Sequence, residues 1–103
     1  MKAVVIEKPG TMVLKDMPVP EPPEGFVRVR VKAAAICATD LEVLDGNIAA
    51  KYPLIPGHEW SGIVDSVGKG VDAKWIGERV IGSNDVVCLT CPACRRGEWR
   101  YCK

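Results

Sequence analysis

The chain has 103 residues, of which 48% are hydrophobic and 26% are charged. This is the composition of one globular domain, and it excludes a disordered or membrane-embedded chain. The formal net charge of +1 lacks the basic excess that nucleic-acid binding usually requires, so we expect no nucleic-acid partner. No run of 18 apolar residues occurs, so we expect no membrane partner either. The apolar start is too short for a signal peptide, which predicts a cytoplasmic protein with reduced thiols.

Glycine and proline divide the first third of the chain into short segments that have the patterns of strands. Apolar runs predict strands at residues 3–6 and 12–17, and the prolines of residues 18–23 prevent regular pairing after them. Residues 26–33 follow, in which valine alternates with arginine or lysine. This alternation predicts a strand with one apolar face and one solvent-facing side.

The only helix that we predict covers residues 39–46. Ala38 or Thr39 would cap its start, two leucines repeat at helical spacing, and Gly46 would end it. Together with the strands, this helix predicts a mainly-β domain, a small barrel or sandwich with one short helix.

Two further strands are predicted at residues 60–67 and 78–81, joined by a glycine-rich segment. Residues 68–73 fit the pattern G-x-G-x-x-A, which in dinucleotide-binding proteins opens a helix that holds the pyrophosphate. Here Gly77 follows within four residues and strand-like sequence comes next, which leaves no room for such a helix. We therefore predict a β-hairpin turn.

Four of the five cysteines are close together in the sequence, with the spacing C-x2-C-x2-C-x7-C. Four thiolates at this spacing suit a tetrahedral metal ion, most often zinc, and nearby arginines would offset their negative charge. Two disulfides or free buried thiols are the alternatives. An iron–sulfur cluster is disfavoured because the ferredoxin pattern has three residues before its last cysteine. The pattern predicts a metal site formed by Cys88, Cys91, Cys94 and Cys102.

The fifth cysteine, Cys37, and the only histidine, His58, form a second candidate group with Glu59. Taken singly, a cysteine is usually a small buried apolar residue, and a histidine is usually a satisfied polar one. Taken together, the three residues could bind zinc and leave one position open for water or substrate, as a catalytic site requires. A nucleophilic Cys–His pair is the competing interpretation, but the sequence indicates no third group to orient the histidine.

The motifs occur in an order that resembles the zinc-containing medium-chain alcohol and polyol dehydrogenases over residues 1–103. They are Cys37-Ala38-Thr39-Asp40, Pro56-Gly57-His58-Glu59-Trp60-Ser61-Gly62, Val67-Gly68-Lys69-Gly70-Val71, Gly77-Glu78-Arg79-Val80 and the four-cysteine segment. The resemblance implies that residues 1–103 are the N-terminal part of a GroES-like catalytic domain. On this resemblance we expect a partly open β-barrel with a zinc-binding lobe at residues 88–102, and we expect the Rossmann domain for NAD(P) to be absent from residues 1–103.

The resemblance also implies roles for single residues. Cys37 and His58 match ligands of a catalytic zinc, and Glu59 matches a residue that is a ligand in some members and a neighbour of the ligands in others. Thr39 matches the hydroxyl that relays the substrate's proton, and Asp40 matches a supporting residue beside it. The ligands of a structural zinc are matched by Cys88, Cys91, Cys94 and Cys102.

The implied function is the oxidation of a small-molecule alcohol or polyol to a carbonyl with NAD(P), by an enzyme with two zinc ions per chain. Full-length members of the family are usually homo-oligomers. Family chains are about three times as long as this one, and Ala38 and Glu42 depart from the residues that are common in the family, which leaves the alcohol class open. We expect the isolated chain to be inactive, because the resemblance places the binding site of the hydride acceptor in the Rossmann domain. The alternative is a stand-alone zinc-binding structural module with a GroES-like fold and no catalysis, which has no need of Cys37, His58 and Glu59.

Overall fold

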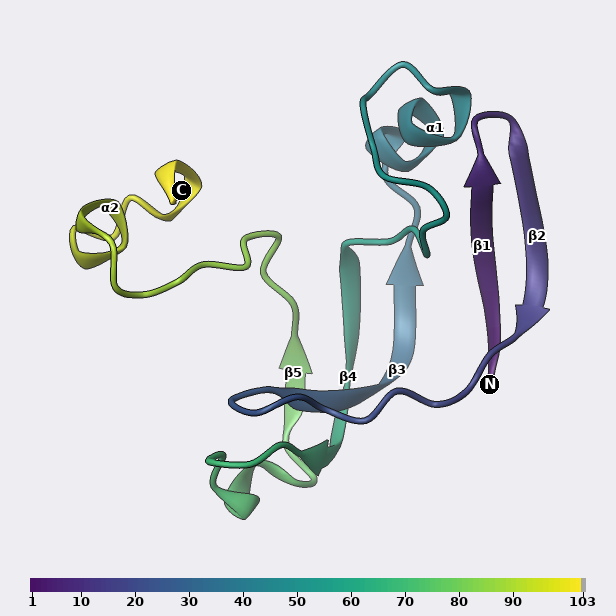
Figure 1. Cartoon of the computed structure of the whole chain (residues 1–103). Helices are drawn as coiled ribbons and strands as arrows, with labels where there is room; N and C mark the ends of the chain where they lie inside the picture. Colours follow the sequence, from purple (N-terminus) through teal and green to yellow (C-terminus); the bar gives the residue numbers. More distant parts are fainter. Residues whose placement is uncertain (103) are drawn as a thin grey trace.

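Two separate antiparallel sheets organise the chain in a computed structural model that describes residues 1–102 (Figure 1). One sheet is a hairpin of β1 (Lys2–Lys8) and β2 (Thr11–Asp16). The other has the order β3-β4-β5 and consists of β3 (Val27–Ala35), β4 (Glu59–Val67) and β5 (Arg79–Ile81). The mainly-β class predicted from the sequence is therefore confirmed, and the two sheets do not close into a barrel.

The β1–β2 hairpin holds most of the small core. Its turn contains Gly10, whose φ of 79° lies in the left-handed region that glycine adopts without strain. Val5 and Ile6 are buried on β1, and the backbone of Ile6 exchanges hydrogen bonds of 2.9 and 3.0 Å with that of Leu54. This isolated bridge fastens the irregular loop before β4 to the hairpin.

Strand β3 is longer and less regular than the sequence pattern predicts. It pairs with β4, but irregularities between Arg28 and Val29 and between Val31 and Ala33 shift the register twice. The prediction of one fully solvent-facing row of basic side chains is therefore wrong at Arg28, which is half-buried and donates a 2.8 Å hydrogen bond to Asp65. A partly buried guanidinium requires such a partner, because its charge has lost part of its hydration.

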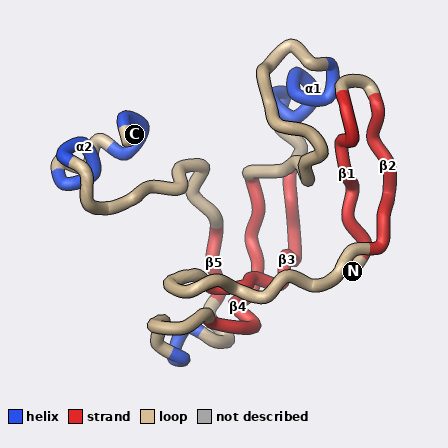
Figure 2. The backbone as a smooth tube through the Cα atoms, in the orientation of Figure 1, coloured by secondary structure: helices blue, strands red, loops and turns tan. Residues whose placement is uncertain are grey.

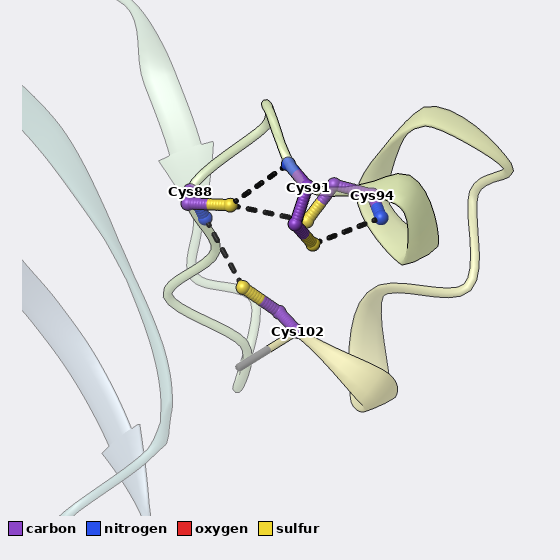
Figure 3. Close-up of side chains that lie close together, drawn as sticks. All are labelled: Cys88, Cys91, Cys94 and Cys102. Atoms are coloured by element: carbon purple, nitrogen blue, oxygen red, sulfur yellow. Dashed lines mark hydrogen bonds between the residues drawn. The ribbon is translucent and has the colours of Figure 1, made fainter.

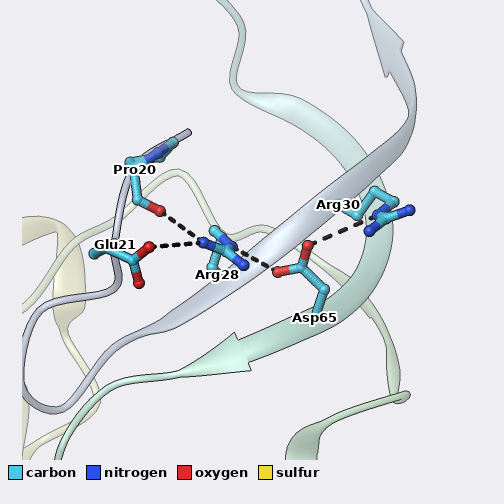
Figure 4. A network of polar contacts seen from close by, with 5 residues as sticks. All are labelled: Pro20, Glu21, Arg28, Arg30 and Asp65. Carbon is cyan, nitrogen blue, oxygen red and sulfur yellow. Dashed lines mark hydrogen bonds and ion pairs between the residues drawn. The ribbon is translucent and has the colours of Figure 1, made fainter. Parts of the chain in front are cut away.

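Arg28 also fastens the proline-rich segment 18–25 to this sheet (Figure 4). Its Nη1 donates to the carbonyl of Pro20 at 3.2 Å, and Glu21 lies 3.5 Å away. The hydrogen bond from Arg28 lowers the pKa of Asp65, and the same bond raises the pKa of Arg28. The strands and the segment that joins them to the hairpin are thus tied together by one polar network.

The glycine-rich segment after β4 serves close packing. A Cβ added to Gly68 would lie 1.9 Å from the carbonyl oxygen of Pro23, so only glycine fits beside the proline-rich segment. The segment then forms a 3₁₀ turn, Ala73–Trp75, and returns as β5 antiparallel to β4. The prediction of a hairpin connection in place of a dinucleotide-binding helix is confirmed.

Helix α1 (Ala38–Asp45) begins one residue earlier than predicted. Its N-cap is Cys37, which corrects the expectation of Ala38 or Thr39, because the Asp40 carboxylate accepts a 2.9 Å hydrogen bond from the Cys37 N–H. Gly46 ends the helix with a φ of 81°, as predicted. The carbonyl of Leu44 accepts a 2.7 Å hydrogen bond from the Gly10 N–H, which attaches the helix end to the hairpin turn.

The last segment, residues 82–102, leaves the sheets and ends in a lobe that stands apart from them (Figure 2). The lobe contains a single-turn helix α2 (Pro92–Arg95) and a 3₁₀ turn (Trp99–Tyr101), so the sequence-based expectation of one short helix missed α2. No helix within residues 1–102 has both the length and the apolar character to cross a membrane.

Candidate metal centres

The four cysteines of the lobe converge on one point (Figure 3). The sulfur atoms of Cys88, Cys91, Cys94 and Cys102 all lie within 4.8 Å of one another. Zinc–sulfur bonds of about 2.3 Å in a tetrahedron place the sulfurs about 3.8 Å apart, and the Cys88–Cys94 sulfur distance is 3.8 Å. A disulfide needs about 2.05 Å, and all five cysteines are free. The donor set and its spacing therefore fit a four-thiolate zinc site.

The backbone of the lobe directs N–H groups at these sulfurs. Leu89 adopts a φ of 61°, which turns the N–H groups of Thr90 and Cys91 toward the Cys88 sulfur at 3.5 and 3.2 Å. Pro92 then starts α2, whose first turn sends the Cys94 N–H to the Cys91 sulfur at 3.4 Å. These donors stabilise negative charge on sulfur, which is the form that binds a metal.

The same contacts separate the acidities of the thiols. Hydrogen bonds from Thr90, first its hydroxyl and then its backbone N–H, lower the pKa of Cys88 to about 5. The backbone N–H of Cys94 lowers the pKa of Cys91, whereas burial raises the pKa of Cys94 to about 12. The thiolate form is therefore favoured most at Cys88, whereas burial holds the proton on Cys94, which metal binding has to displace.

The second group lies at the end of the sheet where β3 ends and β4 begins. Ala35 pairs with Glu59 in the β3–β4 ladder, and this pairing brings Cys37 and His58 together across 21 residues of sequence. One ligand atom each of Cys37, His58 and Glu59 lies within 4.8 Å of the others. Cysteine sulfur, imidazole nitrogen and carboxylate oxygen are all zinc ligands, and three of them leave a coordination position open.

Asp40 holds this group together. Its Oδ2 accepts the hydrogen bond from the Cys37 N–H, and its Oδ1 accepts one of 3.2 Å from the Gly57 N–H and lies 3.5 Å from Nδ1 of His58. Its side chain is only 15% exposed. The sequence indicated no group that orients the histidine. The available signal was the C-x-x-D spacing from Cys37 to Asp40, which resembles a capping box at the start of a helix.

Thr39 and Asn84 complete the surroundings of the open group. The Thr39 hydroxyl lies 3.6 Å from the Cys37 sulfur on the exposed start of α1. A shallow cavity of about 470 Å³ borders His58 and Glu59, and Asn84 lines it from the segment after β5. Asn84 carried no recognisable signal in the sequence, because a single polar residue in a loop is ordinary there.

An open β-domain with one closed four-thiolate group and one incomplete Cys–His–Glu group is a candidate zinc-binding module of an enzyme. Residues 23–103 match the family described as the alcohol dehydrogenase GroES-like domain. The chain belongs to this family, and the resemblance noted from its motifs is confirmed.

Individual relatives agree with this assignment. The chain is 38% identical to D-altritol 5-dehydrogenase of Agrobacterium fabrum, over 99% of the chain and 31% of that protein. A crystal structure of an Escherichia coli CFT073 alcohol dehydrogenase, rspB, complexed with NADH has a TM-score of 0.92 and 40% identity, over 99% of this chain and 30% of that one. The apo form of zinc-dependent alcohol dehydrogenase 2 of Streptococcus pneumonia has a TM-score of 0.90 and 34% identity, with 100% and 30% covered. The chain thus spans less than a third of the length of these proteins.

Proposed function

We propose that the chain is the N-terminal part of a zinc-dependent dehydrogenase that oxidises an alcohol or polyol to a carbonyl with NAD(P). The convergence of Cys37, His58 and Glu59 beside a shallow cavity carries the proposal. The four-cysteine lobe already offers a structural metal site, so a purely structural module would not need this second group. Relatives named for an alcohol, for a polyol and for bound NADH support the reaction class.

In this proposal Cys37, His58 and Glu59 hold a catalytic zinc, which when bound would make a substrate hydroxyl more acidic. Thr39 offers its hydroxyl next to the Cys37 sulfur, where it can accept that proton and pass it to solvent. Asp40 keeps Cys37 and the Gly57–His58 segment in place through its two oxygens. These roles assign the chemistry to the junction of β3, α1 and β4.

The lobe receives a different role. Cys88, Cys91, Cys94 and Cys102 would fill all four positions of a tetrahedral zinc, so no position remains for a substrate. Such a closed site contributes folding free energy to a segment that otherwise lies apart from the sheets. We propose one catalytic and one structural zinc per chain.

The hydride acceptor would be bound outside residues 1–103, because the G-x-G-x-x-A segment forms a hairpin connection and not a nucleotide-binding helix. We therefore expect residues 1–103 alone to lack dehydrogenase activity, and we place the complete enzyme, with its small-molecule substrate, in the cytoplasm. Measurable NAD(P)H binding by the 103-residue chain would contradict this part of the proposal.

Metal analysis of the purified chain and of Cys37→Ser tests the assignment. We expect two zinc ions per chain, falling to one in Cys37→Ser, whereas Cys88→Ser should disturb the other site. Substitution with cobalt(II) distinguishes the two, since four-thiolate and mixed Cys–His–Glu coordination have different absorption spectra. One metal ion per chain that is unaffected by Cys37→Ser would instead identify a structural module without a catalytic site.

A further inference from the structure

Tyr52 links the two segments that carry Cys37 and His58. It begins the irregular loop that leads to His58, which we call the ligand loop, residues 52–58. The Tyr52 hydroxyl donates a part-buried hydrogen bond to the carbonyl of Val43 in helix α1, and this helix begins directly after Cys37. A contact between α1 and the ligand loop therefore bears on how the sulfur and the imidazole meet.

Two hydrogen bonds between these segments fix more than one does. At the start of α1, the Asp40 carboxylate accepts the 3.2 Å hydrogen bond from the Gly57 N–H. Near the end of α1, the Val43 carbonyl accepts the bond from Tyr52. A helix of eight residues is about 12 Å long, and with the first bond alone it could still pivot about its first turn. The second bond removes this freedom, so the direction of α1 relative to the ligand loop is set.

The end of α1 depends on partners from outside the helix. The last carbonyls of any helix have no partner within it, and an isolated helix of this length is not stable in water. The carbonyl of Leu44 accepts the Gly10 N–H at 2.7 Å, which holds α1 on the β1–β2 hairpin. The bond from Tyr52 holds the same turn of α1 on the ligand loop. The two bonds have different consequences, because the ligand loop carries His58 and the hairpin carries no ligand of this group.

We propose that Tyr52 is a positioning residue of the candidate catalytic metal group. Its hydroxyl holds α1 against the ligand loop, so that Cys37 and His58 stay at a separation that one metal ion can bridge. Because the two segments are ordered before the metal binds, less conformational freedom is lost on binding, and the affinity is higher. This role deepens the proposed function and rests on it, since Cys37, His58 and Glu59 are the metal ligands there.

Tyr52→Phe tests the role, because it removes the hydroxyl and keeps the ring. The Val43 carbonyl retains the 3.2 Å bond from the Gly46 N–H, so no unpaired group is created in the helix. In a cobalt(II) titration of the 103-residue chain, the affinity of the open group should fall at least about threefold, as the loss of one neutral hydrogen bond implies. At saturating cobalt(II), the absorption bands of the open group should shift, because the direction of α1 is no longer set.

Asn47→Ala is the matched control. Asn47 donates a 2.9 Å side-chain hydrogen bond to Glu42 at the same end of α1, and this bond does not involve the ligand loop. The variant should therefore keep the affinity and the absorption bands of the open group. The four-cysteine site is the internal reference and should be the same in both variants. An unchanged affinity or an unshifted spectrum in Tyr52→Phe would overturn the proposal, and so would equal changes in Asn47→Ala.

Amide hydrogen exchange measured by NMR tests the same role without metal at the open group. The Gly57 N–H, which is bonded to Asp40, should exchange at least about threefold faster in Tyr52→Phe, whereas the amides of the β1–β2 hairpin should keep their rates. An unchanged Gly57 rate, or an equal acceleration over the hairpin, would overturn the proposal, because the effect would then be absent or global. If the wild-type chain binds no cobalt(II) at the open group, the proposed catalytic site fails, and the exchange rates still uphold or overturn the ordering of the two segments by Tyr52.

Discussion

Replacing Asp40 by asparagine tests how the open Cys–His–Glu group is held together. Both carboxylate oxygens accept a backbone N–H, Oδ2 from Cys37 at 2.9 Å and Oδ1 from Gly57 at 3.2 Å. Asparagine has the same shape but only one acceptor oxygen, and its NH₂ group would face one of these N–H donors. The substitution therefore removes one hydrogen bond to a charged acceptor and leaves a backbone donor without a partner.

The expected cost follows from that count. A hydrogen bond to a charged group contributes about 1.5–3 kcal/mol, and an unsatisfied donor costs a similar amount when it is shielded from water. Asp40 is only 15% exposed, so water does not readily replace the lost contact. If the freed Gly57–His58 segment must be ordered again on metal binding, zinc affinity at the Cys37–His58–Glu59 group falls about 10- to 150-fold. Losses of this order are typical when residues that orient metal ligands are replaced.

Competition titration with a chromogenic zinc chelator measures this loss. The control is Asp45→Asn on the same helix, because Asp45 is exposed and makes no side-chain hydrogen bond among the contacts of residues 1–102. Its charge lies at the C-terminal end of α1, where a carboxylate is not stabilised by the helix dipole, so we expect no loss of affinity. The four-cysteine site should keep its affinity in both variants. Equal zinc affinity of Asp40→Asn and Asp45→Asn at the open site would refute the reasoning.

Three further predictions concern other parts of the chain. Gly68→Ala should lower the free energy of unfolding by at least about 2 kcal/mol in urea, because the added Cβ would meet the Pro23 carbonyl. The matched comparison is Gly70→Ala, which should cost about 1 kcal/mol, because Gly70 has an unfavourable φ of 82° but open space around it. Leu89→Gly should raise zinc affinity of the lobe about fivefold by removing about 1 kcal/mol of left-handed strain, and an unchanged affinity would mean that the φ of 61° carries no cost. The pKa of Asp65 in the folded chain lies below its ordinary 3.8, so the ionised carboxylate contributes its full stability above pH 3.8, and this contribution is lost as the pH falls below 3.8. Asp65→Asn should therefore flatten the acidic part of the profile of stability against pH. An identical profile in the variant would contradict a contribution of the Arg28–Asp65 ion pair.

Much of the fold was predictable because its signals are local. The apolar runs and the glycine positions predicted five strands and one helix, and the structure contains these elements with ends shifted by a few residues. The two register shifts in the β3–β4 pairing and the single-turn helix α2 were not predictable in this way. A register shift depends on what lies across the strand pair, and here the partner side chain of Arg28 is Asp65, 37 residues further along the chain.

The two candidate metal groups show the same division. The sequence alone determined the identity and spacing of the cysteines in the lobe, and a C-x2-C turn is short enough for its own backbone to direct N–H groups at sulfur. Cys37 and His58 have no such local connection. Only the β3–β4 pairing, with Ala35 opposite Glu59, decides that they meet, and only the folded chain brings Asp40 between them. Local backbone geometry follows from neighbouring residues, whereas a site assembled across 21 residues requires the register of a sheet.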